Sequence, residues 1–428
     1  MLRESFKWML VTLFAAAILI AAVLGLIKYI QIQGRVEADV VPSPIAEVAV
    51  PNDSVQPFLP TPAATPDPTP TPMPKNTNEK IRQYIAGMST EQKLGQMVLF
   101  GFAGTSSPSD TFIEILHTYQ IGNIILYGNN IKSGNNDGGF TQCSKLIDAA
   151  KSEIVTQVPP LVAIDIEGGN VTRFTWSNWP ASARTLGRRR DRAYAEEQFA
   201  VIGQKLMETG INLNLAPVLD VSEDPMSTFL ETRIISEDAE ITSAIGAAVI
   251  DGLHSAGCLS TAKHFPGHGG TTQDSHDVTP VVQKSIEDMD NYDLKPFAAA
   301  VDAGVDAILV AHILYPSLDE NEIASMSPVI ITDLLRDQLG FTGVVMSDDF
   351  RMGGLTTRYD ISDAAVRFVL AGGDMIMCGA QHDKQIAIMD GLLAAAGDGR
   401  LTGERIDESV FRILKKKLVA ANFQAELQ

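Results

Sequence analysis

The stretch Gly257-Cys-Leu-Ser-Thr-Ala-Lys-His-Phe-Pro-Gly-His-Gly-Gly-Thr-Thr-Gln-Asp-Ser-His276 joins a short apolar segment to a loop rich in ionisable side chains. Residues 257–262 predict a buried strand, and the loop after them holds three of the seven histidines. Pro266 and Gly267 separate His264 from His268, so these two cannot share a helix face as a helical zinc pair would. We therefore expect Lys263 and His264 to leave the C-terminal end of a strand, where barrel enzymes hold their reactive groups.

After residue 80, apolar segments alternate with amphipathic ones, as they do in parallel α/β folds. Eight segments predict strands: 97–102, 122–127, 161–166, 212–217, 258–262, 307–311, 343–347 and 374–378. Helices are predicted at 193–209, 239–255, 286–303 and 403–421, and a leading helix at 78–87 is followed by a Ser89 cap. Because eight strands close a TIM barrel, the sequence predicts one α/β domain with a (β/α)8 TIM-type barrel.

Two segments of different composition precede the predicted barrel. Residues 8–27 form an uncharged run that is long enough to cross a bilayer as a helix. The alternative is a cleaved signal peptide, which would make the protein secreted. Residues 41–75 contain eleven of the 22 prolines, which predicts an extended spacer. We expect a transmembrane anchor in residues 1–30, a Pro/Thr-rich linker in 31–75 and the barrel, outside the cytoplasm, in 76–428.

The composition excludes some classes of partner. A formal net charge of −19 argues against nucleic-acid binding, which needs clustered Lys and Arg, and favours a neutral substrate. Cys143, Cys258 and Cys378 lie far apart in apolar or helical contexts, so we expect buried free thiols rather than a disulfide framework or a metal site.

Polar residues follow the predicted strands at the ends that should meet in one mouth. They are Asp165, Glu167 and Arg173 after the third strand, Asp220 after the fourth, Arg233 in a later loop, Lys263 and His264 after the fifth, His312 after the sixth, and Asp348 and Asp349 after the seventh. A single strand-end aspartate could serve as a helix cap or a surface ion pair. The placement of all these polar residues at the same ends of the strands instead favours an active site.

Two reactions suit this set of residues. Glycoside hydrolysis needs a carboxylate on one side of the anomeric carbon and a proton donor on the other. Asp348 is the candidate nucleophile, and His276, oriented by Asp274, is the candidate acid and base. The alternative is metal-assisted hydrolysis with His264, His268, His276 or His312 as ligands. Its signal is weaker, because the strand-borne His-x-His pair of metal-dependent barrel hydrolases is missing.

The chain resembles the bacterial β-N-acetylglucosaminidases of glycoside hydrolase family 3 from about residue 78 onward. The motifs are Ile-Asp165-x-Glu-Gly-Gly-x-Val-x-Arg173, Asn-Leu-Ala-Pro-Val-Leu-Asp220, Lys263-His-Phe-Pro-Gly-His-Gly followed by Asp274-Ser-His276, and Ser347-Asp348-Asp349. The resemblance implies a retaining mechanism with Asp348 as nucleophile and Asp274–His276 as acid/base pair. It also implies that Asp165, Arg173, Arg233, Lys263 and His264 hold the N-acetylglucosamine ring.

The expected function is therefore a retaining β-N-acetylhexosaminidase without metal or cofactor, acting as a monomer on a carbohydrate substrate. The predicted anchor and spacer favour fragments of peptidoglycan as that substrate. The alternatives are a glucosidase or xylosidase of the same family, a metal-dependent barrel hydrolase, and a wall-binding barrel without activity. The intact Asp348, Asp274 and His276 argue against the last, since a pure binding protein needs neither nucleophile nor acid.

Overall fold

The computed structural model describes residues 75–132, 137–176, 179–225 and 228–420. The predicted anchor and nearly all of the predicted linker lie outside these ranges. Within them, no helix has both the length and the apolar character needed to cross a membrane.

The fold is an eight-stranded parallel barrel. The strands are β1 (Val98–Gly101), β2 (Asn123–Leu126), β3 (Leu161–Ile164), β4 (Leu213–Asn214), β5 (Leu259–Phe265), β6 (Ala307–Val310), β7 (Val344–Ser347) and β8 (Ile376–Cys378). From β1 to β7 each strand pairs with the next one in the chain, and β8 pairs with β1. A parallel bridge between Met346 and Met375 brings β7 beside β8, which nearly closes the barrel. All eight predicted strands are present.

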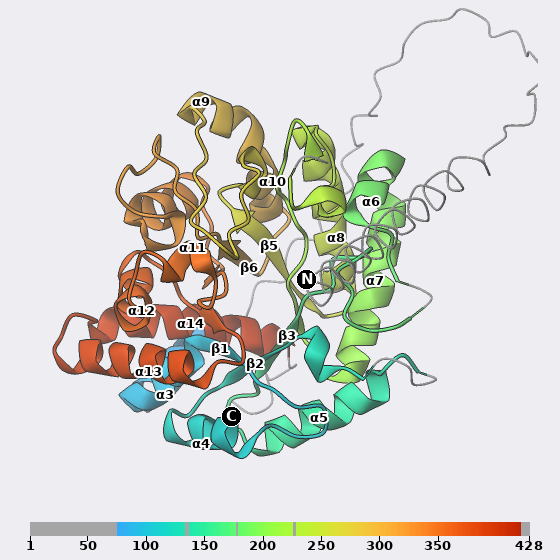
Figure 1. The fold of residues 1–428 in the computed structure, drawn as a ribbon. Helices are drawn as coiled ribbons and strands as arrows, with labels where there is room; N and C mark the ends of the chain where they lie inside the picture. Colours follow the sequence, from blue (N-terminus) through green and yellow to red (C-terminus); the bar gives the residue numbers. More distant parts are fainter. Residues whose placement is uncertain (1–74, 133–136, 177–178, 226–227, 421–428) are drawn as a thin grey trace, which may run out of the picture. The chain divides into compact units, whose positions relative to one another are not determined.

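Helices surround the strands (Figure 1). They are α2 (Lys75–Ala86), α3 (Thr90–Gln96), α4 (Asp110–Thr118), α5 (Phe140–Ser152), α6 (Ala183–Arg189), α7 (Arg192–Thr209), α8 (Ala239–Ser255), α9 (Ile286–Asp288), α10 (Lys295–Asp302), α11 (Gly353–Thr356), α12 (Ile361–Leu370), α13 (His382–Gly397) and α14 (Gly403–Ala420). A π-helix, η7 (Val329–Gln338), connects β6 to β7. Every residue of each strand is buried, because a parallel sheet in a barrel is covered on both faces.

The predicted cap and thiols are also observed. Ser89 forms a capping box with Gln92 at the start of α3. Cys143, Cys258 and Cys378 are buried and free, as predicted.

Two elements differ from the prediction. The helix expected at 286–303 is divided into α9, a five-residue π segment (Met289–Asp293) and α10. Pro296 lies in the first turn of α10, the place in a helix where proline is tolerated. Strand β5 also runs on through Phe265, so Lys263 and His264 lie within the strand and not beyond its end.

Candidate active site

A cavity of about 440 Å³ opens at the C-terminal ends of the strands. Seven of the eight predicted site residues line it, namely Asp165, Arg173, Arg233, Lys263, His264, His276 and Asp348. The eighth, Asp274, does not line the cavity but contacts His276. Residues that are up to 183 positions apart in the sequence, Asp165 and Asp348, therefore share one mouth because the strands are parallel.

One side of the cavity is an ordered row of alternating charges. The Lys263 ammonium donates to Asp165 Oδ1 at 2.7 Å and contacts Glu167 Oε1 at 2.7 Å. Arg233 donates to both carboxylate oxygens of Glu167, at 2.8 and 2.9 Å. Arg173 donates to Asp165 Oδ2 at 3.1 Å. Such paired, forked contacts fix the donors that a sugar hydroxyl would meet.

The row keeps its members ionised. Burial by itself would raise the pKa of Asp165, but Lys263 and Arg173 outweigh it and hold that pKa well below its usual range. Burial would likewise lower the pKa of Lys263, yet Asp165 and Glu167 raise it, so Lys263 remains an ammonium. The cavity therefore offers fixed charges near neutral pH.

His264 is held by a buried aspartate behind it. Its Nδ1 lies 2.6 Å from Asp220 Oδ2, and Asp220 Oδ1 accepts from the backbone N–H of His264 and of His268. Asp220 is fully buried, and His264 Nε2 lies 3.4 Å from Arg233 Nη2. Asp220 thus orients the imidazole, with Nε2 toward the cavity.

Asp348 follows the last residue of β7 and is half-buried in the cavity wall. Its backbone N–H donates to Val310 O at 3.1 Å, which ties it to the neighbouring strand. Its carboxylate accepts the backbone N–H of Asp349 at 2.8 Å. It forms no salt bridge with any of the described residues, so its second oxygen is available to a substrate.

His276 and Asp274 form a close pair on the loop after β5. Asp274 Oδ1 accepts from the His276 backbone at 2.9 Å and lies 2.7 Å from Nδ1 of the His276 ring. Burial would raise the pKa of Asp274, but the backbone and ring of His276 lower it. The Asp274 carboxylate accepts the hydrogen bond from Nδ1–H, so Nε2 of the 63% exposed ring is the nitrogen available to a substrate.

The first half of this loop is firmly packed, although it is rich in glycine. His268 is 1% exposed, and its Nε2 lies 2.9 Å from Ser275 Oγ. A Cβ on Gly269 would lie 1.9 Å from Val221 O, so the glycine permits close backbone packing. The part of the loop that begins at Gly270 and includes His276 is mostly exposed.

The loop is also docked on the segment that follows Asp348. The backbone N–H of Gly353 donates to His276 O at 2.8 Å, and that of Gly354 donates to Ser275 O at 2.9 Å. A Cβ on Gly353 would lie 2.2 Å from Asp277 O. These glycines therefore let the predicted acid/base loop approach the segment that carries the predicted nucleophile.

Tyr127 and Arg351 also line the cavity, and the sequence predicted no role for either. Tyr127 donates from its hydroxyl to Asp349 Oδ2 at 2.9 Å, and Arg351 binds the same oxygen at 2.6 Å. The Arg351 guanidinium also lies over the Tyr127 ring at 5.1 Å. Burial and the nearby Asp349 raise the pKa of Tyr127 well above its usual value, so its hydroxyl stays protonated. The only signal in the sequence was that Tyr127 ends a predicted strand.

Among the described residues, no group of three or more His, Cys, Asp and Glu side chains is arranged to hold a metal ion. The buried histidines already have other contacts: His268 contacts Ser275, and His312 Nδ1 lies 2.8 Å from Ser325 Oγ.

Comparison with known proteins gives a family match. The model of the glycosyl hydrolase family 3 N-terminal domain matches residues 89–416, which confirms the predicted resemblance. "Beta-hexosaminidase A" of Pseudoalteromonas piscicida is 30% identical over 380 residues, which cover 79% of this chain and 63% of that protein. "Beta-hexosaminidase" of Stenotrophomonas maltophilia is 32% identical over 341 residues, which cover 74% of this chain and 98% of that protein.

A solved structure agrees in fold. The glycoside hydrolase family 3 β-N-acetylglucosaminidase from a Paenibacillus species superposes with a TM-score of 0.73 at 35% identity. The match covers 78% of this chain and 63% of that one. The chain thus spans less than two thirds of two of these relatives and nearly all of the third.

Proposed function

The chain belongs to glycosyl hydrolase family 3, and on that premise we propose that it is a retaining β-N-acetylhexosaminidase that removes terminal β-linked N-acetylglucosamine. One observation carries the proposal: Asp348, a carboxylate without a salt bridge among the described residues, shares a cavity with the exposed ring of His276. The β-hexosaminidase relatives and the β-N-acetylglucosaminidase structure support the choice of sugar.

In the first step, the Asp348 carboxylate attacks the anomeric carbon while His276 Nε2 gives a proton to the departing glycosidic oxygen. The products are a glycosyl-aspartate and a free aglycone. In the second step, neutral His276 takes a proton from water, and the water oxygen displaces Asp348 from the anomeric carbon. Asp274 stabilises the imidazolium form at its Nδ1 side.

The charged row at Asp165 binds the sugar hydroxyls. Its Lys263, Arg173 and Arg233 donors are held by carboxylates, so they need not reorganise when the ring arrives. His264 adds a further donor or acceptor through Nε2, since its Nδ1 is occupied by Asp220. Together these side chains hold the ring with its anomeric carbon toward Asp348.

The substrate is a fragment of peptidoglycan, met outside the cytoplasm. The uncharged run at residues 8–27 serves as a membrane anchor, and the proline-rich segment 41–75 holds the enzyme away from the bilayer as a monomer. The support is the sequence alone: its length, lack of charge and proline content.

The test is a panel of chromogenic substrates with the purified full chain. We expect turnover of the β-N-acetylglucosaminide to exceed that of the β-glucoside and β-xyloside, with no change on adding a chelator. Preference for the glucoside would replace the proposed substrate class. Loss of activity with the chelator would favour the metal-dependent hydrolase, and no turnover of any sugar would favour a binding protein.

The role of His276 can be tested separately with His276→Ala. The variant should slow substrates with poor leaving groups by about a hundredfold, because their oxygen must be protonated to depart. Nitrophenyl glycosides should be affected much less, since nitrophenolate leaves without a proton. An equal loss on both substrates would show that His276 is not the acid.

A further inference from the structure

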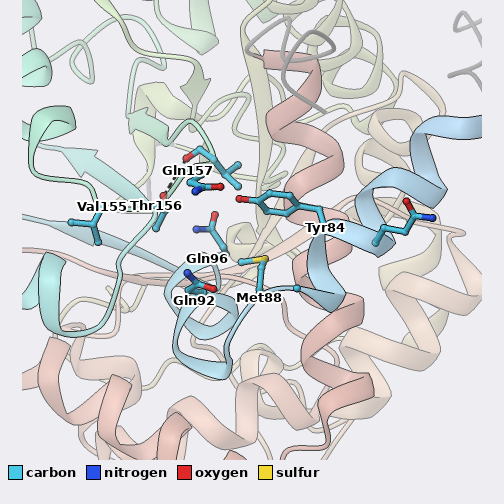
Figure 2. Close-up of a pocket in the computed structure, with 10 residues that line it drawn as sticks. Tyr84, Met88, Gln92, Gln96, Val155, Thr156 and Gln157 are labelled. Atoms are coloured by element: carbon cyan, nitrogen blue, oxygen red, sulfur yellow. Dashed lines mark hydrogen bonds between the residues drawn. The ribbon is translucent and has the colours of Figure 1, made fainter. Parts of the chain in front are cut away.

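A second cavity lies at the other end of the barrel. It measures about 420 Å³, close to the 440 Å³ of the cavity beside Asp348. Its wall is formed by the end of α2, by α3 and by residues 155–158 (Figure 2). Because α3 leads into β1 and residues 155–158 lead into β3, this cavity lies at the N-terminal ends of the strands, where the proposed reaction does not take place.

The wall of this cavity is uncharged although the chain carries a net charge of −19. Four of its ten residues are glutamines, whose carboxamides both donate and accept hydrogen bonds: Gln83, Gln92, Gln96 and Gln157. Tyr84 and Thr156 add hydroxyls, and Met88, Val155 and Val158 add apolar surface. Such a wall suits a neutral ligand that carries amide, hydroxyl and methyl groups, and it offers nothing to pair with an ion.

Gln96 carries a buried donor with no partner. Its Oε1 accepts from the buried Lys417 Nζ at 2.5 Å. Its Nε2 then has no hydrogen-bond partner among the described residues, although Gln96 is fully buried. Figure 2 shows Gln96 in the middle of the lining residues, with Gln92, Gln157 and Tyr84 around it. A ligand carbonyl in the cavity would satisfy this donor.

We propose that this cavity is a second, non-catalytic site for an N-acetylhexosamine unit of a glycan. The acetamido carbonyl accepts from Gln96 Nε2, the acetyl methyl packs against Met88 and Val158, and the ring hydroxyls bond to Gln157 and Tyr84. The choice of ligand rests on the proposed function. Such a site keeps the domain on a glycan network while the end of another strand is cleaved beside Asp348.

The test is calorimetric titration of the full chain carrying Asp348→Asn with a β-1,4-linked tetramer of N-acetylglucosamine. We expect two binding equivalents. Adding Gln96→Glu should leave one, because the carboxylate keeps the shape and the acceptor for Lys417 but replaces the Nε2 donor with an oxygen. Gln157→Ala, at an exposed position, should weaken the second equivalent by about fivefold. Gln204→Ala, an exposed glutamine on α7, is the control and should leave both.

Two outcomes overturn the inference. The first is a single binding equivalent of the tetramer for the chain that carries only Asp348→Asn, which means that the cavity holds water alone. The second is two equivalents that neither Gln96→Glu nor Gln157→Ala alters. The enzyme with Asp348 intact separates this failure from failure of the proposed function. There, Gln96→Glu should turn over the small chromogenic β-N-acetylglucosaminide within about twofold of the unaltered chain, since the mouth is untouched. If the enzyme turns over the chromogenic substrate but the Asp348→Asn protein binds only one equivalent of the tetramer, the second site is rejected and the proposed activity stands. Absence of turnover in the unaltered chain would reject the proposed activity.

Discussion

At the N-terminal ends of the strands buried carboxylates are surrounded by cations, whereas at the C-terminal ends Asp348 forms no salt bridge with any described residue. Asp374, before β8, is fully buried and accepts from Arg336 at 2.5 Å and Arg412 at 3.0 Å. Asp306, before β6, accepts from Lys416 at 2.8 Å and contacts His254 at 2.7 Å.

The mouth at the C-terminal ends contains equally dense salt bridges around Asp165 and Glu167. Other polar groups of the mouth, however, lack a salt-bridge or hydrogen-bond partner among the described residues. Asp348 forms no salt bridge with the described residues, and the buried His268 Nδ1 and His312 Nε2 have no hydrogen-bond partner among them. A carboxylate closed in by arginines is a poor nucleophile, while one held only by a backbone N–H keeps a free oxygen. We infer that the base of the barrel uses charge for stability and that the mouth keeps one charge available for reaction.

The largest expected effect is on activity at the mouth. Asp348→Asn should lower kcat by about a thousandfold or more, because the nucleophile is lost, while the melting temperature stays near that of the unaltered chain. The measurement is turnover of a chromogenic β-N-acetylglucosaminide beside a thermal melt. Activity within a few fold of the unaltered chain would remove Asp348 from the mechanism.

A matching substitution at the N-terminal ends of the strands should lower stability and leave activity unchanged. Asp374→Asn leaves three arginines, Arg336, Arg405 and Arg412, without their shared buried carboxylate, and it should destabilise the fold by about 3 kcal/mol. The folded fraction should keep its kcat. Chemical unfolding measures the loss, and Asp398→Asn, at an exposed surface pair, is the control. A loss of kcat without a loss of stability would contradict the division between the two ends.

A third effect concerns the buried histidine of the mouth. Burial lowers the pKa of His268 to about 4, below its ordinary value of 6.5, so the folded protein holds it neutral. Above pH 6.5 this residue is neutral in both the folded and the unfolded protein, so the full stability is present. As the pH falls from 6.5 toward 4, the unfolded chain takes up a proton that the folded protein does not, and the free energy of unfolding decreases. Between pH 7 and pH 5 the loss should be about 2 kcal/mol.

Replacing this histidine should remove that part of the pH dependence. The free energy of unfolding in urea is measured for His268→Gln at pH 7 and at pH 5. The difference between the two values should be smaller than in the unaltered chain by about 2 kcal/mol. His117→Gln, a half-exposed histidine near the end of α4, is the control. Identical pH differences in the His268 variant and the unaltered chain would show that His268 is not the group responsible.

The smallest expected effect tests the docking of the acid/base loop. A Cβ on Gly354 would lie 2.8 Å from His312 O and 3.0 Å from Ser275 O, so Gly354→Ala should shift the loop and with it His276. We expect about a tenfold lower kcat/KM for substrates with poor leaving groups and less change for nitrophenyl glycosides. Gly397→Ala, where a Cβ meets nothing within 4 Å, should change neither. Equal losses on both substrates would contradict a role through His276.

The sequence by itself determined the barrel and most of the charged residues of its mouth. Apolar runs such as residues 307–311 and 343–347, separated by amphipathic helices, specify parallel strands, and the polar residue after each strand must then lie at one rim. Seven of the eight predicted site residues accordingly line one cavity. These features depend on local patterning and on chain order, which are read directly from a sequence.

The partners within the mouth were decided only by the tertiary structure. Tyr127 meets Asp349 across 222 positions and Arg233 meets Glu167 across 66, and no local pattern encodes either contact. The docking of Ser275 and His276 on Gly353 and Gly354 is likewise a contact between the connections that follow two different strands. The physical reason is that strand register and barrel closure set which side chains face one another, and both depend on packing summed over the whole domain.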